Sequence, residues 1–233
     1  ALAAADITIS SASISWNTYG QAGFNLRYIH GTDTVLVENV KSPYALTNLD
    51  DADDYYVQVQ VTCDEDNWSE TLHFVTKQAP ATIPYANDFE AKSGWAFING
   101  TFGNVWAYGE AAHNGEGTHA LYISNNGGAA NAYTTGSSAA VYATKLFQFE
   151  DGVYNFKYDW KAYGESNYDL LCVALVPDSI ELAATATGTF SLPTGWTKLH
   201  EANKLNLSST WNTESFDLIA RSEERFSRNA ETD

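Results

Sequence analysis

The sequence is poor in basic residues and in long apolar runs, and each shortage excludes a class of protein. It has 12 Lys and Arg residues against 29 Asp and Glu residues, for a formal net charge of −17. A surface this acidic repels nucleic acid and anionic lipid, so we expect neither as a partner. No stretch approaches the roughly 18 consecutive apolar residues of a membrane-spanning helix, so we expect no membrane insertion.

Sulfur-containing residues are almost absent. The two cysteines, Cys63 and Cys172, fall in segments that we assign to different domains, so we expect two free thiols and no disulfide. The sequence has no methionine and begins at Ala1, and we interpret it as an internal fragment or a processed product. No signal peptide is visible, which says nothing about the parent gene.

Catalytic signatures are missing as well. The sequence has no G-x-S-x-G, H-E-x-x-H or Walker-type motif. His113 and His119 could bind zinc together with Glu110 and Glu116, but the spacing of the two histidines suits neither a helix nor a strand, and a surface loop is the favoured interpretation. We therefore predict that the chain is not an enzyme.

What the sequence does contain is alternation. Between Tyr154 and Trp160, aromatic residues alternate with polar ones, a period of two that places the rings on one face of a strand. We expect a turn at Gly164 and a second strand from Tyr168 to Val176, which would complete a hairpin. An aromatic face needs a second sheet to cover it, so this segment predicts a β-sandwich.

Residues 1–77 predict a small sandwich of seven short strands. The clearest is the YYVQVQV run that starts at Tyr55, in which apolar and polar residues alternate. The other six expected strands lie around residues 7–9, 14–16, 24–28, 35–37, 44–46 and 72–76.

Landmarks in this segment resemble a fibronectin type III domain. They are Trp16, Tyr28, Leu49 followed six positions later by Tyr55, and a closing FVT at 74–76. The resemblance implies that Trp16 fills the core and that Tyr55 forms a tyrosine corner, in which the hydroxyl is hydrogen-bonded to the backbone. Both of these are structural roles.

A second set of landmarks occupies residues 85–220. They are PYANDFE at 84–90, Gly94-Trp95, NVW at 104–106, HALYISNNGG at 119–128, the aromatic strand described above and Trp211. Their order and spacing resemble the cleaved-adhesin or choice-of-anchor J type of module, a MAM-like jelly-roll sandwich of bacterial secreted and surface proteins. The predicted fold class is therefore all-β, with a fibronectin type III-like sandwich followed by a jelly roll.

Two segments lie outside these predicted domains. Residues 78–84, QAPATIP, are the expected linker, because two prolines interrupt both helix and strand. Residues 221–233 form an atypical tail that holds three arginines, although Arg27 is the only arginine before it. We hypothesise that the jelly roll is truncated at its C-terminus or that the tail is foreign sequence.

Asp88 and Glu90 are candidate calcium ligands. They flank Phe89, so on a strand both carboxylates would point to one side while Phe89 enters the core. The resemblance implies the same site, because MAM-like jelly rolls often bind Ca²⁺ through an acidic residue of the N-terminal strand. Asp169 is the third expected ligand, and the ion would be structural. The alternative is two solvated carboxylates at the start of a strand.

Two other acidic runs are interpreted as solvated turn charge. They are DDADD at 50–54 and the acidic residues at 64–66. They lie at opposite ends of the predicted sixth strand, so they cannot share one ion.

Exposed aromatic side chains on a jelly roll can hold sugars. The candidates are Trp95, Trp106, Tyr108, Trp196 and Trp211. The alternative for each is a place in the core. The glycine-rich stretches 100–117 and 125–136 are predicted long loops, where binding residues usually lie.

These patterns together predict a non-catalytic adhesion or binding fragment, extracellular or on a bacterial cell surface. The fibronectin-like domain would be a spacer, and the jelly roll would bind a glycan or a host or matrix protein. The alternative is an accessory binding region of a larger secreted protease or glycoside hydrolase.

Overall fold

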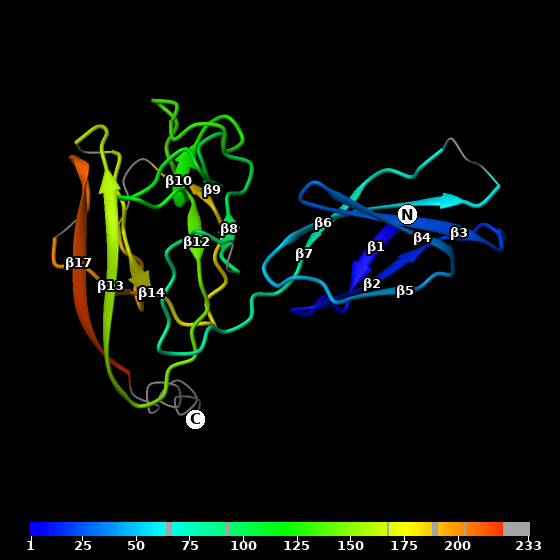
Figure 1. Ribbon diagram of the computed structural model, residues 1–233, viewed down its shortest axis with the longest axis horizontal. Helices are drawn as coiled ribbons and strands as arrows, with labels where there is room; N and C mark the ends of the chain where they lie inside the picture. Colours follow the sequence, from blue (N-terminus) through cyan, green and yellow to red (C-terminus); the bar gives the residue numbers. More distant parts are fainter. Residues whose placement is uncertain (64–66, 92–93, 167, 188–190, 203, 221–233) are drawn as a thin grey trace, which may run out of the picture. The chain divides into compact units, whose positions relative to one another are not determined.

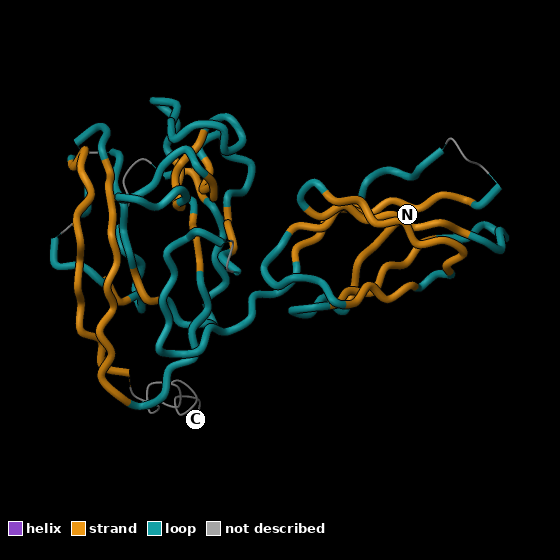
Figure 2. Tube along the Cα trace, viewed as in Figure 1, coloured by secondary structure: helices purple, strands orange, loops and turns teal. Residues whose placement is uncertain are grey.

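The computed structural model describes residues 1–63, 67–91, 94–166, 168–187, 191–202 and 204–220. Within these residues every regular element is a β-strand, and Figure 2 shows strands and loops without a helix. The chain forms two compact units, Ala1–Pro80 with Gly94–Ala96, and Ala81–Ser93 with the chain from Phe97 onward. The all-β fold class predicted from the sequence is confirmed.

In the part of the chain that the structure describes, no helix has the length and hydropathy needed to cross a membrane.

The first unit is a sandwich of two antiparallel sheets (Figure 1). The first sheet has the order β1-β2-β5, with strands β1 (Leu2–Ala5), β2 (Ser11–Trp16) and β5 (Tyr44–Thr47). The second has the order β4-β3-β6-β7, with strands β3 (Phe24–His30), β4 (Asp33–Val40), β6 (Asp54–Val61) and β7 (Leu72–Val75). Three strands facing four over one core is the kind of sandwich that the fibronectin type III resemblance implies.

Residues at every second position of β2 and β6, and at the start of β3, form much of the core. In β6, Tyr55, Val57 and Val59 are buried while Asp54 and Tyr56 are exposed. The buried residues of the core come from both sheets and from the turn before β6: Ala12, Ile14, Trp16, Phe24, Leu26, Val40, Leu46, Leu49, Tyr55, Val57, Val59 and Phe74. Burial of this apolar area is the main stabilising term of the sandwich.

The core position predicted for Trp16 is confirmed. Its side chain is buried, and its ring meets that of Phe24 edge-on at a centroid distance of 5.5 Å. Phe24 begins β3, so this contact joins the two sheets directly.

The strand expected around residues 7–9 is wrong, because the first strand lies at Leu2–Ala5. Asp6 has φ 50°, which turns the chain at the end of β1. The N–H of Thr8 then donates to the carbonyl of Ser11 at 2.8 Å, which closes a turn before β2. Ile7 still packs against the core, so its apolar character is explained by a loop contact.

The second unit consists of strand pairs joined by long loops (Figures 1 and 2). The pairs are β8 (Ala96–Ile98) with β12 (Tyr142–Thr144), β9 (Val105–Gly109) with β10 (Ala120–Ser124), β11 (Ala139–Ala140) with β15 (Thr185–Ala186), β14 (Ala174–Leu175) with β16 (Thr197–Lys198), and β13 (Gly152–Ala162) with β17 (Ser208–Ala220). The complete jelly-roll topology stays a prediction.

The aromatic strand predicted from the sequence is β13, the longest strand but one. Its burial alternates along its length, with Tyr154, Phe156, Tyr158 and Trp160 on the inner face. Figure 1 shows β13 and β17 running side by side, and Phe156 lies opposite Phe216 in their register. The predicted sidedness of this strand is confirmed.

The predicted hairpin between β13 and residues 168–176 is wrong. In that segment only Ala174–Leu175 is a strand, and it pairs with β16. The chain after β13 turns locally instead, since the N–H of Glu165 donates to the carboxylate of Asp169 at 2.6 Å and the N–H of Asp169 donates back to the carbonyl of Glu165 at 3.0 Å. The long partner that β13 requires comes from 208–220, much later in the sequence.

Two expectations concern residues that the structure does not describe. The acidic run at 64–66 and the tail at 221–233 both lie outside the described residues.

Candidate functional site

A strand pair in the second unit positions two stacked rings. β9 and β10 are antiparallel, and Ala120 lies opposite Gly109. Tyr108 is the last but one residue of β9, and His119 immediately precedes β10. Because the pairing brings these two positions together, the rings stack with centroids 5.3 Å apart and an interplanar angle of 18°.

The carboxylate of Glu90 is bound by the chain at the start of β10. Its Oε1 accepts the backbone N–H of Thr118 at 2.8 Å and that of His119 at 3.3 Å, and its Oε2 accepts the hydroxyl of Thr118 at 2.5 Å. These donors, above all the Thr118 hydroxyl, lower the pKa of Glu90 to about 2. Gly117 leaves room for the carboxylate, since a Cβ there would lie 2.9 Å from Oε1.

His119 has a carboxylate on each side of its ring. Nδ1 lies 3.7 Å from Oε2 of Glu90, and Nε2 lies 3.7 Å from Oε1 of Glu110. The His119 side chain is 24% exposed and that of Glu110 is 78% exposed, so the outer part of the group faces solvent. Burial raises the pKa of Tyr108, and the negative charges of Glu90 and Asp88 raise it further.

We call this group the Glu90–His119 cluster. Its members share one small region of the second unit and combine carboxylates, hydrogen-bond donors and two rings: Asp88, Glu90, Tyr108, Glu110, Thr118 and His119. Such a set can accept hydrogen bonds from hydroxyl or ammonium groups and can pack against an apolar face.

The strand expected at Asp88–Glu90 is wrong. Exposure does alternate, with Phe89 half-buried between two exposed carboxylates, but the segment is a turn in which Phe89 has φ 64°. Asn87 Oδ1 accepts the N–H of Phe89 at 2.8 Å, and Asp88 Oδ1 accepts the N–H of Glu90 at 3.1 Å. These side chains take the backbone donors that a sheet ladder would otherwise use.

The structure does not bring the three predicted calcium ligands together. The carboxylate of Asp169 accepts the N–H of Glu165, in the turn after β13, while Glu90 is bound at the start of β10. Among the described residues, the group of three His, Cys, Asp or Glu side chains whose ligand atoms lie within 4.8 Å of one another is His30, Asp50 and Asp53, in the first unit. The residues chosen for calcium therefore do not form a convergent oxygen set, and calcium binding stays a prediction.

The tryptophans chosen as sugar platforms have packing contacts. Trp106 donates its indole N–H to the carbonyl of Val141 at 3.1 Å, and the ring of Trp196 meets Tyr142 edge-on at 5.8 Å. Trp211 packs against a small buried cluster on β10 and the loop before it, and the Lys161 ammonium lies 5.4 Å from its ring. Trp95 is half-buried.

Of the five aromatic candidates, Tyr108 is the one that belongs to the Glu90–His119 cluster. The zinc alternative grouped His113 and His119 with Glu110 and Glu116. In the structure His119 lies beside Glu110, whereas His113 and Glu116 are exposed loop residues outside any group of three ligands among the described residues.

Sequence reasoning missed Thr118 as the principal partner of Glu90. The two residues are 28 positions apart, and no local pattern links them. It also missed His30 and treated Asp53 as solvated turn charge. Asp53 is in fact buried, and its carboxylate lies 2.6 Å from Nε2 of His30.

Comparison with known proteins finds similarity to solved structures. No protein-family model matches the sequence, and no curated protein matches it. A structure described as a myokine shares 21% identity over 33% of this chain and 93% of its own, with a TM-score of 0.30. The FN1–FN3 domains of chicken CNTN1 share 22% identity over 33% of this chain and 31% of their own, with a TM-score of 0.28. A two-domain fibronectin type III segment from chicken tenascin shares 14% identity over 66% of this chain and 86% of its own, with a TM-score of 0.30.

Proposed function

We propose that this chain is a non-catalytic, extracellular binding fragment whose second unit binds a glycan through the Glu90–His119 cluster. The first unit serves as a spacer. The observation that carries the proposal is the stacked pair of Tyr108 and His119 with the carboxylates of Glu90 and Glu110 on either side.

The chemistry of the cluster suits a sugar. Hydroxyl groups of a sugar donate to carboxylate oxygens, and the C–H face of a pyranose packs on an aromatic ring. Glu110 is largely exposed and Tyr108 is partly exposed at the end of a strand pair, so both can reach a ligand without moving the sheet. Tyr108 is a residue of β9, and Glu110 and His119 each lie one residue beyond the paired strands, so the sheet limits their movement.

The ionisation of Glu90 supports binding over acid catalysis. A general acid needs a pKa near the working pH, so that it carries a proton to donate. The pKa of Glu90 is lowered to about 2 by Thr118 and His119, so this carboxyl is ionised near neutral pH. It is therefore suited to accept hydrogen bonds.

We also propose that the chain is part of a bacterial cell-surface or secreted protein. The order of motifs from residue 84 to Trp211, which resembles the cleaved-adhesin or choice-of-anchor J type, supports a role in adhesion. The second candidate ligand is a host or matrix protein. The second candidate for the parent protein is a larger secreted protease or glycoside hydrolase, of which this chain would be an accessory binding region.

A glycan array and a matrix-protein panel probed with the whole chain test the proposal. We expect glycan binding that falls at least tenfold in Glu110→Ala and in Tyr108→Ala, while Tyr163→Ala, an exposed tyrosine outside the cluster, leaves it unchanged. Binding to a matrix protein and to no glycan would contradict the glycan proposal and identify a matrix protein as the ligand. Absence of binding on both panels, by a chain shown to be folded, would leave a purely architectural role and contradict the proposal.

A further inference from the structure

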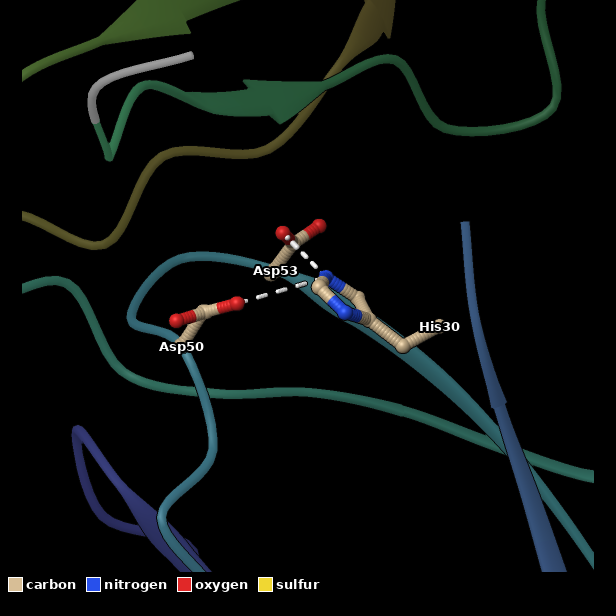
Figure 3. Close-up of side chains that lie close together, drawn as sticks. All are labelled: His30, Asp50 and Asp53. Atoms are coloured by element: carbon tan, nitrogen blue, oxygen red, sulfur yellow. Dashed lines mark hydrogen bonds and ion pairs between the residues drawn. The ribbon is translucent and has the colours of Figure 1, made fainter. Parts of the chain in front are cut away.

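Three side chains at one end of the first sandwich converge on a common point (Figure 3). His30 is the last residue of β3, Asp50 lies in the turn after β5, and Asp53 immediately precedes β6. His30 Nε2 lies 2.6 Å from Oδ2 of Asp53 and 3.8 Å from Oδ2 of Asp50. All three ligand atoms lie within 4.8 Å of one another.

We propose that His30, Asp50 and Asp53 form a binding site for a divalent cation of the zinc class. Imidazole nitrogen and carboxylate oxygen are ligands that Zn²⁺, Co²⁺ and Mn²⁺ accept, whereas Ca²⁺ prefers a set made only of oxygens. Three protein ligands leave a fourth position for water, the usual arrangement of an open zinc site.

The spacing of the ligand atoms fits such an ion after small shifts. Bonds of about 2.1 Å in tetrahedral geometry place two ligand atoms roughly 3.4 Å apart. The distances from Nε2 to the two carboxylates, 2.6 Å and 3.8 Å, lie on either side of that value. On binding, the cation would lie between Nε2 of His30 and Oδ2 of Asp53, and the neutral imidazole would carry its proton on Nδ1.

The ring of His30 is already oriented. It stacks on the ring of Tyr55 with centroids 4.8 Å apart and an interplanar angle of 18°. Tyr55 is itself buried in the core, so the stack fixes the plane in which Nε2 points at the two carboxylates. A ligand held in this way loses little freedom on binding a metal.

The loop that carries the two carboxylates is fixed as well. The hydroxyl of Tyr55 accepts the N–H of Asp50 at 2.8 Å, and Thr76 Oγ1 donates to the carbonyl of Asp50 at 2.6 Å and accepts the N–H of Asp53 at 3.0 Å. Oδ1 of Asp53 accepts the N–H of Asp54 at 2.9 Å, which leaves Oδ2 directed at His30. These bonds are the outer support that a metal site requires.

Exposure across the three side chains is graded. The side chain of Asp53 is 9% exposed, that of His30 is 31% exposed and that of Asp50 is 74% exposed. The site is thus closed toward the core and open toward solvent, which gives a cation a route of entry. The net charge of −17 raises the local concentration of cations around the chain.

Titration of the whole chain with Zn²⁺ by calorimetry tests the proposal, together with Co²⁺ as an optical probe of ligand geometry. We expect one Zn²⁺ per chain at this site, a rise in melting temperature on binding, and tetrahedral Co²⁺ absorption bands. Affinity should fall at least tenfold in Asp50→Asn and in His30→Gln. Asp50 is mostly exposed, so its variant is expected to fold normally and keeps the test valid if His30→Gln is unstable.

His73→Gln is the matched control. His73 Nε2 lies 2.7 Å from Oδ1 of Asp54, a second histidine–aspartate pair on the same domain, but it belongs to no group of three ligands among the described residues. Its removal should leave Zn²⁺ affinity unchanged. The proposal is overturned if the folded chain binds no Zn²⁺ or Co²⁺, or if Asp50→Asn and His30→Gln bind as tightly as the parent chain.

Discussion

The hydroxyl of Tyr55 accepts a hydrogen bond from the backbone N–H of Asp50, with 2.8 Å between oxygen and nitrogen. The Tyr55 ring is buried between His30 and Phe74, with which it stacks at 4.8 Å and 5.6 Å. Burial is also the main reason that the pKa of Tyr55 is raised. This is the tyrosine corner that the fibronectin type III resemblance implies, and the same side chain supports both the ring and the loop of the proposed cation site.

Removal of that hydroxyl should destabilise the first unit. In Tyr55→Phe the ring stacks remain, but the N–H of Asp50 loses its acceptor, so we expect a loss of about 1–2 kcal/mol in the free energy of unfolding. Urea denaturation followed by fluorescence measures it. Tyr19→Phe, at an 80% exposed position, should change stability by less than about 0.5 kcal/mol. Equal stability of the two variants would show that the corner contributes nothing.

Which residues face inward could be predicted because the signal is local. In β6 and β13 the alternation of apolar and polar residues determines the buried face whatever strand lies alongside. Tyr55 and Trp16 were placed correctly for a different reason, since their spacing resembles a known sandwich.

Which strands pair could not be predicted in the second unit, because pairing depends on residues distant in sequence. β13 takes β17 as its partner, and the residues that follow β13 are used in a turn between Glu165 and Asp169. The contacts of the acidic residues depend on distant residues in the same way. The 50–54 run looked like solvated charge until the fold placed His30 against Asp53.

Stability at acid pH should depend on Glu90. Its pKa is lowered from an ordinary value of 4.5 to about 2 in the folded chain, so its contribution is complete above about pH 4.5 and is lost as the pH falls toward 2. Glu90→Gln removes this dependence. We therefore expect the melting temperatures of parent and variant to converge between pH 4.5 and 2, with the parent higher above that window.

Glu116→Gln provides the comparison for this experiment, because Glu116 is an exposed residue of the same loop region. Its melting temperature should follow that of the parent across the whole range. A constant difference between parent and Glu90→Gln from pH 7 to pH 2 would contradict the assignment of the low pKa to the contacts with Thr118 and His119.

Gly109 at the end of β9 should not tolerate a side chain. A Cβ there would lie 2.7 Å from the hydroxyl oxygen of Tyr122, and that hydroxyl is held by its donation to the carbonyl of Gly128 at 2.6 Å. Gly109→Ala should therefore cost about 1–3 kcal/mol by overpacking. Gly103→Ala, where a Cβ would meet nothing within 4 Å, should be neutral or slightly stabilising in the same thermal-unfolding assay. Similar losses in both variants would contradict the steric explanation.

The two thiols should react at different rates. Cys63 is exposed, whereas Cys172 is half-buried and burial raises the pKa of its thiol, so less of it is present as the reactive thiolate. With a disulfide reagent at pH 8, we expect Cys172 to react measurably more slowly than Cys63, because burial lowers both its thiolate fraction and its access to the reagent. Cys63→Ser and Cys172→Ser assign the two phases, and in 6 M guanidinium, about the concentration that unfolds such domains, both thiols should react alike. A single fast phase from both thiols in the folded chain would contradict the partial burial of Cys172.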